Sequence, residues 1–123
     1  MENNSPDILD DLIKTADAKK ATDIRRYHIT GKRLLVDNVV IVSTQNRIHC
    51  KAVLDELSKR AKEIINQSTD QTDSTRVIVS GNADSEWVIL DLGNDVFHVM
   101  SETMRQYYQL DSLFEEKAVV YHH

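Results

Sequence analysis

Apolar residues recur along this 123-residue chain with two spacings, which separate helices from strands. Near the N-terminus, Ser5-Pro6-Asp7 is typical of a helix start, and apolar residues follow every three or four positions, which predicts a helix ending near Ala18 to Lys20. Residues 23–30 have the pattern of an extended segment, and Val39–Val42 is a β-branched run. The second of these predicts a central strand buried on both faces.

A second helix is predicted over about residues 47–66. Its apolar stripe comprises Ile48, Val53, Leu57, Ala61, Ile64 and Ile65. Opposite charges lie four positions apart in the pairs Lys51–Asp55, Glu56–Arg60 and Lys59–Glu63. Such pairs support a solvated helix face, so the basic character of this segment is better explained by helix structure than by contact with RNA.

The last part of the chain predicts three more strands and a terminal helix. The strands are expected at 76–80, 86–92 and 96–100, with Gly93-Asn94 as a hairpin-type turn. The helix begins at Ser101-Glu102 and runs through Tyr108, and Leu110, Leu113 and Phe114 are expected to pack its continuation onto the core. The order of elements predicts a mixed β-sheet of about five strands with helices packed on it, an α/β or α+β fold.

The length favours a single domain spanning residues 1–123. We expect a flexible loop at 66–75, which contains no apolar residue, and a loose tail at 115–123. The lone Cys50 cannot form an internal disulfide, and no apolar run approaches the length of a membrane span. Together with the acidic N-terminal residues, these features favour a cytoplasmic protein without a membrane partner.

Charge is distributed unevenly along the chain. Residues 67–123 contain ten acidic and three basic side chains, a net charge of -7, whereas residues 31–66 carry +3. A domain this acidic lacks the broad basic surface of a nucleic-acid binder. The acidic half favours encounter with a basic protein surface, although ordinary solubilising charge explains it equally simply.

Several kinds of chemistry find little support in the sequence. His28, His49 and His98 stand apart, without metal-ligand spacing, and Ser43-Thr44-Gln45-Asn46 is not a phosphate-binding loop. Cys50 follows His49 at the start of a helix, but adjacent helical residues do not face each other. We therefore expect no catalytic residue, no metal and no cofactor, and Cys50 to be structural.

One enzymatic alternative remains open. Gly81 followed by Asp91 is similar to the nucleotidyltransferase arrangement, in which paired carboxylates on a strand hold two metal ions. The second carboxylate is needed two positions further on, where this chain has Gly93. A nucleotide-binding or nucleotidyltransferase-type enzyme is thus the alternative hypothesis.

The C-terminal third carries a more specific pattern. Its elements are Gly81, Trp87 to Gly93, His98-Val99-Met100, Glu102, Arg105, Tyr108, Leu110-Asp111 and Leu113-Phe114. Together they resemble the signature of the ribosomal silencing factors, the Iojap-like family. Upstream, Lys20 to Ile24 and Asp37 to Thr44 are similar to further family motifs, with Gln45, Asn94, Asp111 and Phe114 as departures.

The resemblance implies a nucleotidyltransferase-like fold without the catalytic carboxylates, and a role that is not enzymatic. It implies binding to the large ribosomal subunit, at the ribosomal protein numbered fourteen on the intersubunit face. Steric obstruction of the small subunit would then repress translation when nutrients are scarce. The unbound protein is expected to be able to form a homodimer, and contact with ribosomal RNA is expected to be at most peripheral.

The expected partner-binding residues are Trp87, Asp91, His98, Met100, Glu102, Arg105 and Tyr108. Aromatic residues such as Trp87, Tyr107 and Tyr108 are typical interface anchors when they are exposed. The sequence is equally consistent with purely structural roles for these residues. Trp87 and Tyr108 can belong to the core, His98 can be hydrogen-bonded across the sheet, and Arg105 can form an internal brace with Glu102.

Overall fold

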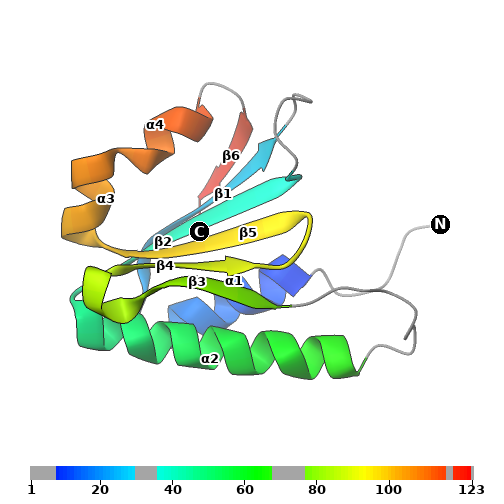
Figure 1. The fold of residues 1–123 in the computed structure, drawn as a ribbon. Coiled ribbons are helices and arrows are strands. Elements are labelled where there is room, and N and C mark those ends of the chain that lie inside the picture. Colours follow the sequence, from blue (N-terminus) through cyan, green and yellow to red (C-terminus); the bar gives the residue numbers. More distant parts are fainter. Residues whose placement is uncertain (1–7, 30–35, 68–76, 116–117, 123) are drawn as a thin grey trace.

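The computed structural model describes residues 8–29, 36–67, 77–115 and the backbone of 118–122. It contains one six-stranded sheet in the order β3-β4-β5-β2-β1-β6, with helices on both faces (Figure 1). The elements are α1 Ile8–Ala18, β1 Thr22–Ile29, β2 Asn38–Thr44, α2 Arg47–Asn66, β3 Ile78–Asn82, the short 3-10 helix η1 Ala83–Ser85, β4 Trp87–Asp91, β5 Asp95–Ser101, α3 Glu102–Tyr108, α4 Leu110–Glu115 and β6 Ala118–His122. The predicted mixed-sheet α+β class is confirmed.

The sheet is mixed because one neighbouring pair runs parallel. Strand β2 pairs with β5 in parallel, with Ile41 opposite His98, and every other neighbouring pair is antiparallel. Helix α2 and the β3–β4 hairpin form the connection between the two parallel strands. The Val39–Val42 run lies in β2 and is buried on both faces, as its β-branched pattern predicted.

The larger core lies between the sheet and the helices α1 and α2. Its helical members are Leu9, Leu12, Ile13, Ala16, Cys50, Val53, Leu57 and Ala61, and its sheet members include Ile24, Val40, Val42, Val88, Leu90, Phe97 and Val99. Arg60 of α2 links the two helices through hydrogen bonds of 2.8 and 2.9 Å to the Asp11 carboxylate. These bonds lower the pKa of Asp11.

The smaller core lies on the opposite face, beneath α3 and α4 (Figure 1). Its buried members are Tyr27, Ile29, Val39, Ile41, Met100 and Phe114, with Val36, Trp87, Met104 and Leu110 packed against them. The rings of Tyr27 and Phe114 lie 5.8 Å apart between centroids. Two short helices thus cover only part of this face, so side chains of β4 remain partly exposed.

The structure corrects three expectations. Residues 118–122 are not a loose tail but form β6, which pairs with β1 and gives the sheet six strands rather than about five. Ile48 is 76% exposed, because the buried stripe of α2 passes through Cys50 instead. Leu113 is 58% exposed, whereas Phe114 supplies the expected packing.

Other sequence expectations have mixed outcomes. The Lys51–Asp55 pair is confirmed at 3.1 Å, but Arg60 pairs with Asp11 and Glu63 rather than with Glu56. Most of the expected loop at 66–75 lies outside the described residues, as does the helix start at 5–7. Along the described parts of the chain, none of the helices has the length and apolar character that a membrane crossing requires.

Candidate functional site

The sheet brings the expected partner-binding residues onto one face. Trp87 and Asp91 project from the same side of β4 because side chains of a strand alternate between faces. Trp87 lies opposite Met100 in the neighbouring β5, and His98 lies opposite Ile89. Helix α3 follows β5 directly and carries the remaining residues of the set, so six of the seven positions lie around the junction of β4, β5 and α3, whereas Asp91 lies opposite Val96 at the other end of β4.

An aromatic series runs from the sheet to the outer side of α3. The ring of Trp87 lies 4.9 Å from that of Tyr108, and the Tyr108 ring lies 4.9 Å from Tyr107 in an edge-on arrangement. Tyr108 is 52% exposed and Tyr107 is 74% exposed. Rings that contact each other and remain open to solvent lose little entropy on binding, which suits them to anchor a partner.

The acidic groups of this face lie at its two ends. Glu102 is exposed in the first turn of α3, and Asp91 is partly exposed at the end of β4. We define the β4–α3 surface as the exposed and partly exposed residues of this region, namely Trp87, Ile89, Asp91, Glu102, Tyr107 and Tyr108. It offers apolar rings and negative charge, a combination that suits a basic protein surface.

His98 supports this surface from beneath. The indole N–H of Trp87 donates to Nδ1 of His98 over 3.1 Å, so that nitrogen is unprotonated. Burial lowers the pKa of His98 to about 4, and the ring is neutral near pH 7. His98 is therefore hydrogen-bonded to a side chain of the neighbouring strand, which is the structural alternative considered from the sequence.

Met100 and Arg105 are also buried. Met100 is inaccessible to solvent and belongs to the smaller core with Tyr27. Arg105, 6% exposed, donates to Asp111 through Nε over 2.8 Å and Nη2 over 2.9 Å. The internal brace considered from sequence therefore exists, but its acid is Asp111 rather than Glu102.

The carboxylates near the β4–β5 turn are engaged separately. Asp91 accepts a hydrogen bond of 2.9 Å from the backbone N–H of Gly93, which closes the turn. Asp95 accepts one of 3.0 Å from the side chain of Asn38 in β2. Among the described residues, no group of three or more histidine, cysteine or acidic side chains is placed to hold a metal ion.

His49 and Cys50 have structural partners. Nδ1 of His49 accepts from the backbone N–H of Gln45 over 3.0 Å, and its Nε2 lies 2.8 Å from the carbonyl of Lys19. Cys50 is buried, with its Sγ 3.8 Å from the carbonyl oxygen of Val99, and burial raises the pKa of the thiol. A thiol held neutral in this way is a poor nucleophile.

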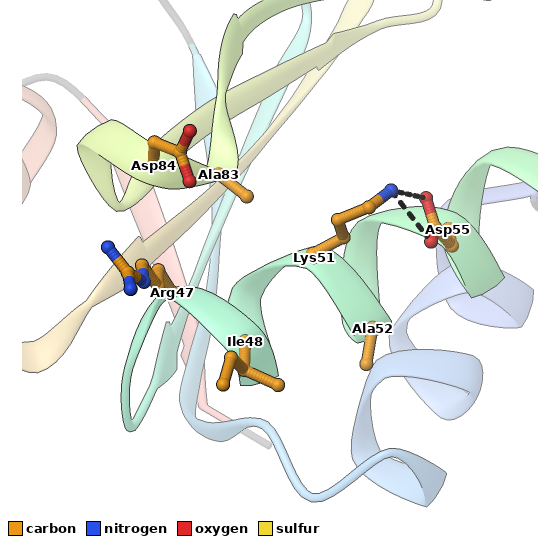
Figure 2. A pocket seen from close by; sticks show the side chains of 7 residues that line it. All are labelled: Arg47, Ile48, Lys51, Ala52, Asp55, Ala83 and Asp84. Carbon is orange, nitrogen blue, oxygen red and sulfur yellow. Dashed lines mark hydrogen bonds and ion pairs between the residues drawn. The ribbon is translucent and has the colours of Figure 1, made fainter.

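A separate pocket of about 330 Å³ lies between the first turns of α2 and the η1 turn. It is lined by Arg47, Ile48, Lys51, Ala52, Asp55, Ala83 and Asp84, and Figure 2 shows Lys51 ion-paired with Asp55 at its side. None of the seven expected partner-binding residues lines this pocket. Its α2 residues, which include Ile48, provide exposed control positions well separated in sequence from the β4–α3 surface.

Sequence reasoning did not single out Ile89 or the link from Tyr27 to Asp111. Ile89 lies two positions from both Trp87 and Asp91, so strand alternation alone would have placed it on their face. The Tyr27 hydroxyl donates to the Asp111 carboxylate across 84 positions of sequence. Local pattern carries no signal for such a contact.

These observations define a small α+β domain with an aromatic and acidic surface beside a short helix. The chain matches the family model described as "Ribosomal silencing factor during starvation" over residues 2–122, and it belongs to that family. A ribosomal silencing factor RsfS from Bacillus subtilis is 30% identical over 114 residues, covering 90% of this chain and 87% of its own. One from Haemophilus influenzae is 27% identical over 103 residues, covering 84% of this chain and 93% of its own.

Solved structures show the same fold. A crystal structure from Bacillus halodurans has a TM-score of 0.69 at 27% identity and covers 86% of this chain and 91% of that one. A crystal structure of a Chromobacterium violaceum protein has a TM-score of 0.73 at 23% identity, with coverage of 87% and 82%. The mixed-sheet α+β fold of this chain is thus shared with these solved structures.

Proposed function

We propose that this protein represses translation by occupying the large ribosomal subunit and keeping the small subunit from joining it. The contact is made at the ribosomal protein numbered fourteen on the intersubunit face, chiefly when nutrients are limiting. The observation that carries the proposal is the family match over residues 2–122. The mechanism is steric, with no bond made or broken, so the protein acts as a regulator and not as an enzyme.

The β4–α3 surface is the proposed contact. Ribosomal proteins are typically basic, and Glu102 in α3 and Asp91 at the far end of β4 offer complementary charge on the same face as the rings of Trp87 and Tyr108. The partly exposed and exposed residues touch the partner. The buried expected residues, His98, Met100 and Arg105, hold that surface in shape from below.

The same surface is relevant to the two other expected partners, a second copy of the chain and ribosomal RNA. Unbound copies pair as a homodimer through it, because exposed rings that suit a partner also suit a second copy. Ribosomal RNA is contacted at most peripherally, since residues 67–123 carry a net charge of -7. The proposed site of action is the cytoplasm, where ribosomal subunits join.

Sucrose-gradient profiles test the proposal directly. Purified subunits are mixed at a magnesium concentration that allows joining, with and without saturating protein. We expect the 70S peak to fall and the protein to sediment with the large subunit. A Tyr108→Ala variant should show a weaker effect at the same concentration, whereas Ile48→Ala, which removes an even more exposed side chain at the separate pocket, should keep it.

Unchanged joining rates in the presence of folded, saturating protein would overturn the proposed function. Pelleting with each isolated subunit separates the two steps of the mechanism. Binding to the large subunit without any effect on joining would retain the partner and reject the steric block.

A further inference from the structure

Two arginine–aspartate pairs in this protein share one geometry but differ in burial. Arg105–Asp111 and Arg60–Asp11 each join Nε to Oδ1 over 2.8 Å and Nη2 to Oδ2 over 2.9 Å. The Arg60 side chain is 38% exposed and that of Arg105 is 6% exposed. A buried ion pair costs desolvation, and it persists where its remaining donors are also satisfied.

The remaining donor of Arg105 reaches two further strands. Its Nη1 donates to the backbone carbonyl of Asp23 in β1 over 2.7 Å and to Oγ of Ser43 in β2 over 2.9 Å. Asp23 adopts a positive φ of 46° within a bulge of the β1–β2 ladder. One guanidinium therefore connects α3 and α4 with two central strands.

Asp111 completes this connection from α4. Its carboxylate accepts hydrogen bonds from both Arg105 and the Tyr27 hydroxyl of β1. Burial raises the pKa of Asp111, but these bonds outweigh burial and its pKa is lowered, so it stays ionised near pH 7. We call Arg105, Asp111 and Tyr27 the clamp.

Helix α3 needs such external support. It has seven residues, and a helix of this length has no appreciable stability of its own in water. It ends at Tyr108, Gln109 caps it with a positive φ of 52°, and α4 starts at the next residue, Leu110. The position of Tyr108 at the end of α3 is therefore set by the tertiary contacts of both helices.

We propose that the clamp is a positioning device, which sets the Tyr108 ring against Trp87 and so gives the β4–α3 surface the shape that its partner recognises. This inference rests on the proposed function and identifies residues that act without touching the partner. Arg105 belongs to the expected binding set, but at 6% exposure it works through Tyr108 and Trp87. Its acid and hydroxyl partners come from α4 and β1.

The chain provides its own reporter and its own control. Trp87 is the sole tryptophan, and its ring contacts Tyr108, so near-UV circular dichroism and tryptophan emission follow the position of α3. Asp111→Asn weakens the clamp with little change of shape, and Tyr27→Phe removes one hydroxyl. Asp11→Asn makes the same substitution in the matching pair on the opposite side of the sheet.

We expect Asp111→Asn to change the near-UV and emission spectra of Trp87, to keep the far-UV spectrum, and to weaken binding to isolated large subunits about tenfold. Tyr27→Phe should act in the same direction by about threefold and keeps the test valid if Asp111→Asn fails to fold. Asp11→Asn should leave both the Trp87 spectra and the affinity unchanged. Asp111→Glu, which retains the carboxylate, should restore most of both properties.

Wild-type Trp87 spectra or wild-type affinity in folded Asp111→Asn and Tyr27→Phe would overturn the clamp as a positioning device. Equal loss in Asp11→Asn would also overturn it, since the effect would then reflect general destabilisation. Failure of the wild-type protein to bind large subunits contradicts the proposed function instead, and in that case the spectra alone decide whether the clamp positions α3.

Discussion

The indole N–H of Trp87 donates a hydrogen bond to Nδ1 of His98 over 3.1 Å, and this bond requires the histidine to be neutral. His98 is 8% exposed, so protonation would bury a charge and remove the acceptor of Trp87. A residue that supports the proposed contact surface is thereby coupled to pH.

Stability should therefore fall in mildly acidic solution. The pKa of His98 is about 4 in the folded protein, against an ordinary value of 6.5, because burial disfavours the charged ring. Between these values the unfolded chain binds a proton that the folded chain does not, so the free energy of unfolding decreases as the pH falls from 6.5 to 4. The loss attributable to His98 should be about 2 to 3 kcal/mol, measured by urea unfolding at a series of pH values.

His98→Gln, which retains an acceptor for Trp87, should flatten the stability profile in this pH range. His28→Gln removes an exposed histidine and controls for the loss of one imidazole. The lowered pKa values of Asp11 and Asp111 act in a different range, since their contribution is lost only as the pH falls below the ordinary value of 3.8. An unchanged slope between pH 6.5 and 4 in His98→Gln contradicts the assignment.

Gly81 should not tolerate a side chain. It has a φ of +77°, and an added Cβ would lie 2.6 Å from the carbonyl oxygen of Trp87. Gly93 has a φ of +96°, but its Cβ would meet nothing within 4 Å. We expect Gly93→Ala to cost about 1 kcal/mol of backbone strain and Gly81→Ala clearly more, up to about 3 kcal/mol. Equal melting temperatures for the two variants would falsify this reasoning.

Substitutions at Tyr108 and Met100 should separate contact from core. Tyr108→Ala removes a 52% exposed ring and should weaken large-subunit binding by about 1 to 3 kcal/mol with little loss of stability. Met100→Ala empties a fully buried position and should lower the free energy of unfolding by about 2 to 5 kcal/mol. Affinity titrations and thermal melts of both variants distinguish a contact residue from a core residue. A collapse of the melting temperature in Tyr108→Ala would place that ring in the core.

Charge reversal at Glu102 should act on the rate of association. An exposed acid at the edge of a contact surface steers encounter with a basic partner, so Glu102→Lys should slow association several-fold and reduce its salt dependence. The dissociation rate should change less. Asp17→Lys reverses an exposed acid on α1, on the other side of the sheet, and serves as the control. Identical association rates in both variants would show that Glu102 faces away from the partner.

Much of the fold follows from local pattern. The bounds of α2 and the burial of Val39–Val42 were predictable from the sequence. An apolar period of 3.6 residues indicates a helix with one buried face, and a continuous β-branched run indicates a strand that is buried on both faces. The family resemblance was also available from spacing alone, and the match over residues 2–122 confirms it. The sixth strand was missed because β6 follows no turn signal and is defined by its pairing with the distant β1.

The candidate site was likewise predictable from the sequence only in part. The sequence by itself placed Trp87, Asp91 and Tyr108 in one signature, since that information lies in residue type and spacing. Tertiary structure alone decided that Arg105 is buried, that its acid is Asp111 rather than Glu102, and that Tyr27 joins them. Burial and hydrogen-bond partners across 84 positions depend on how strands and helices pack, and the pattern of neighbouring residues does not encode them.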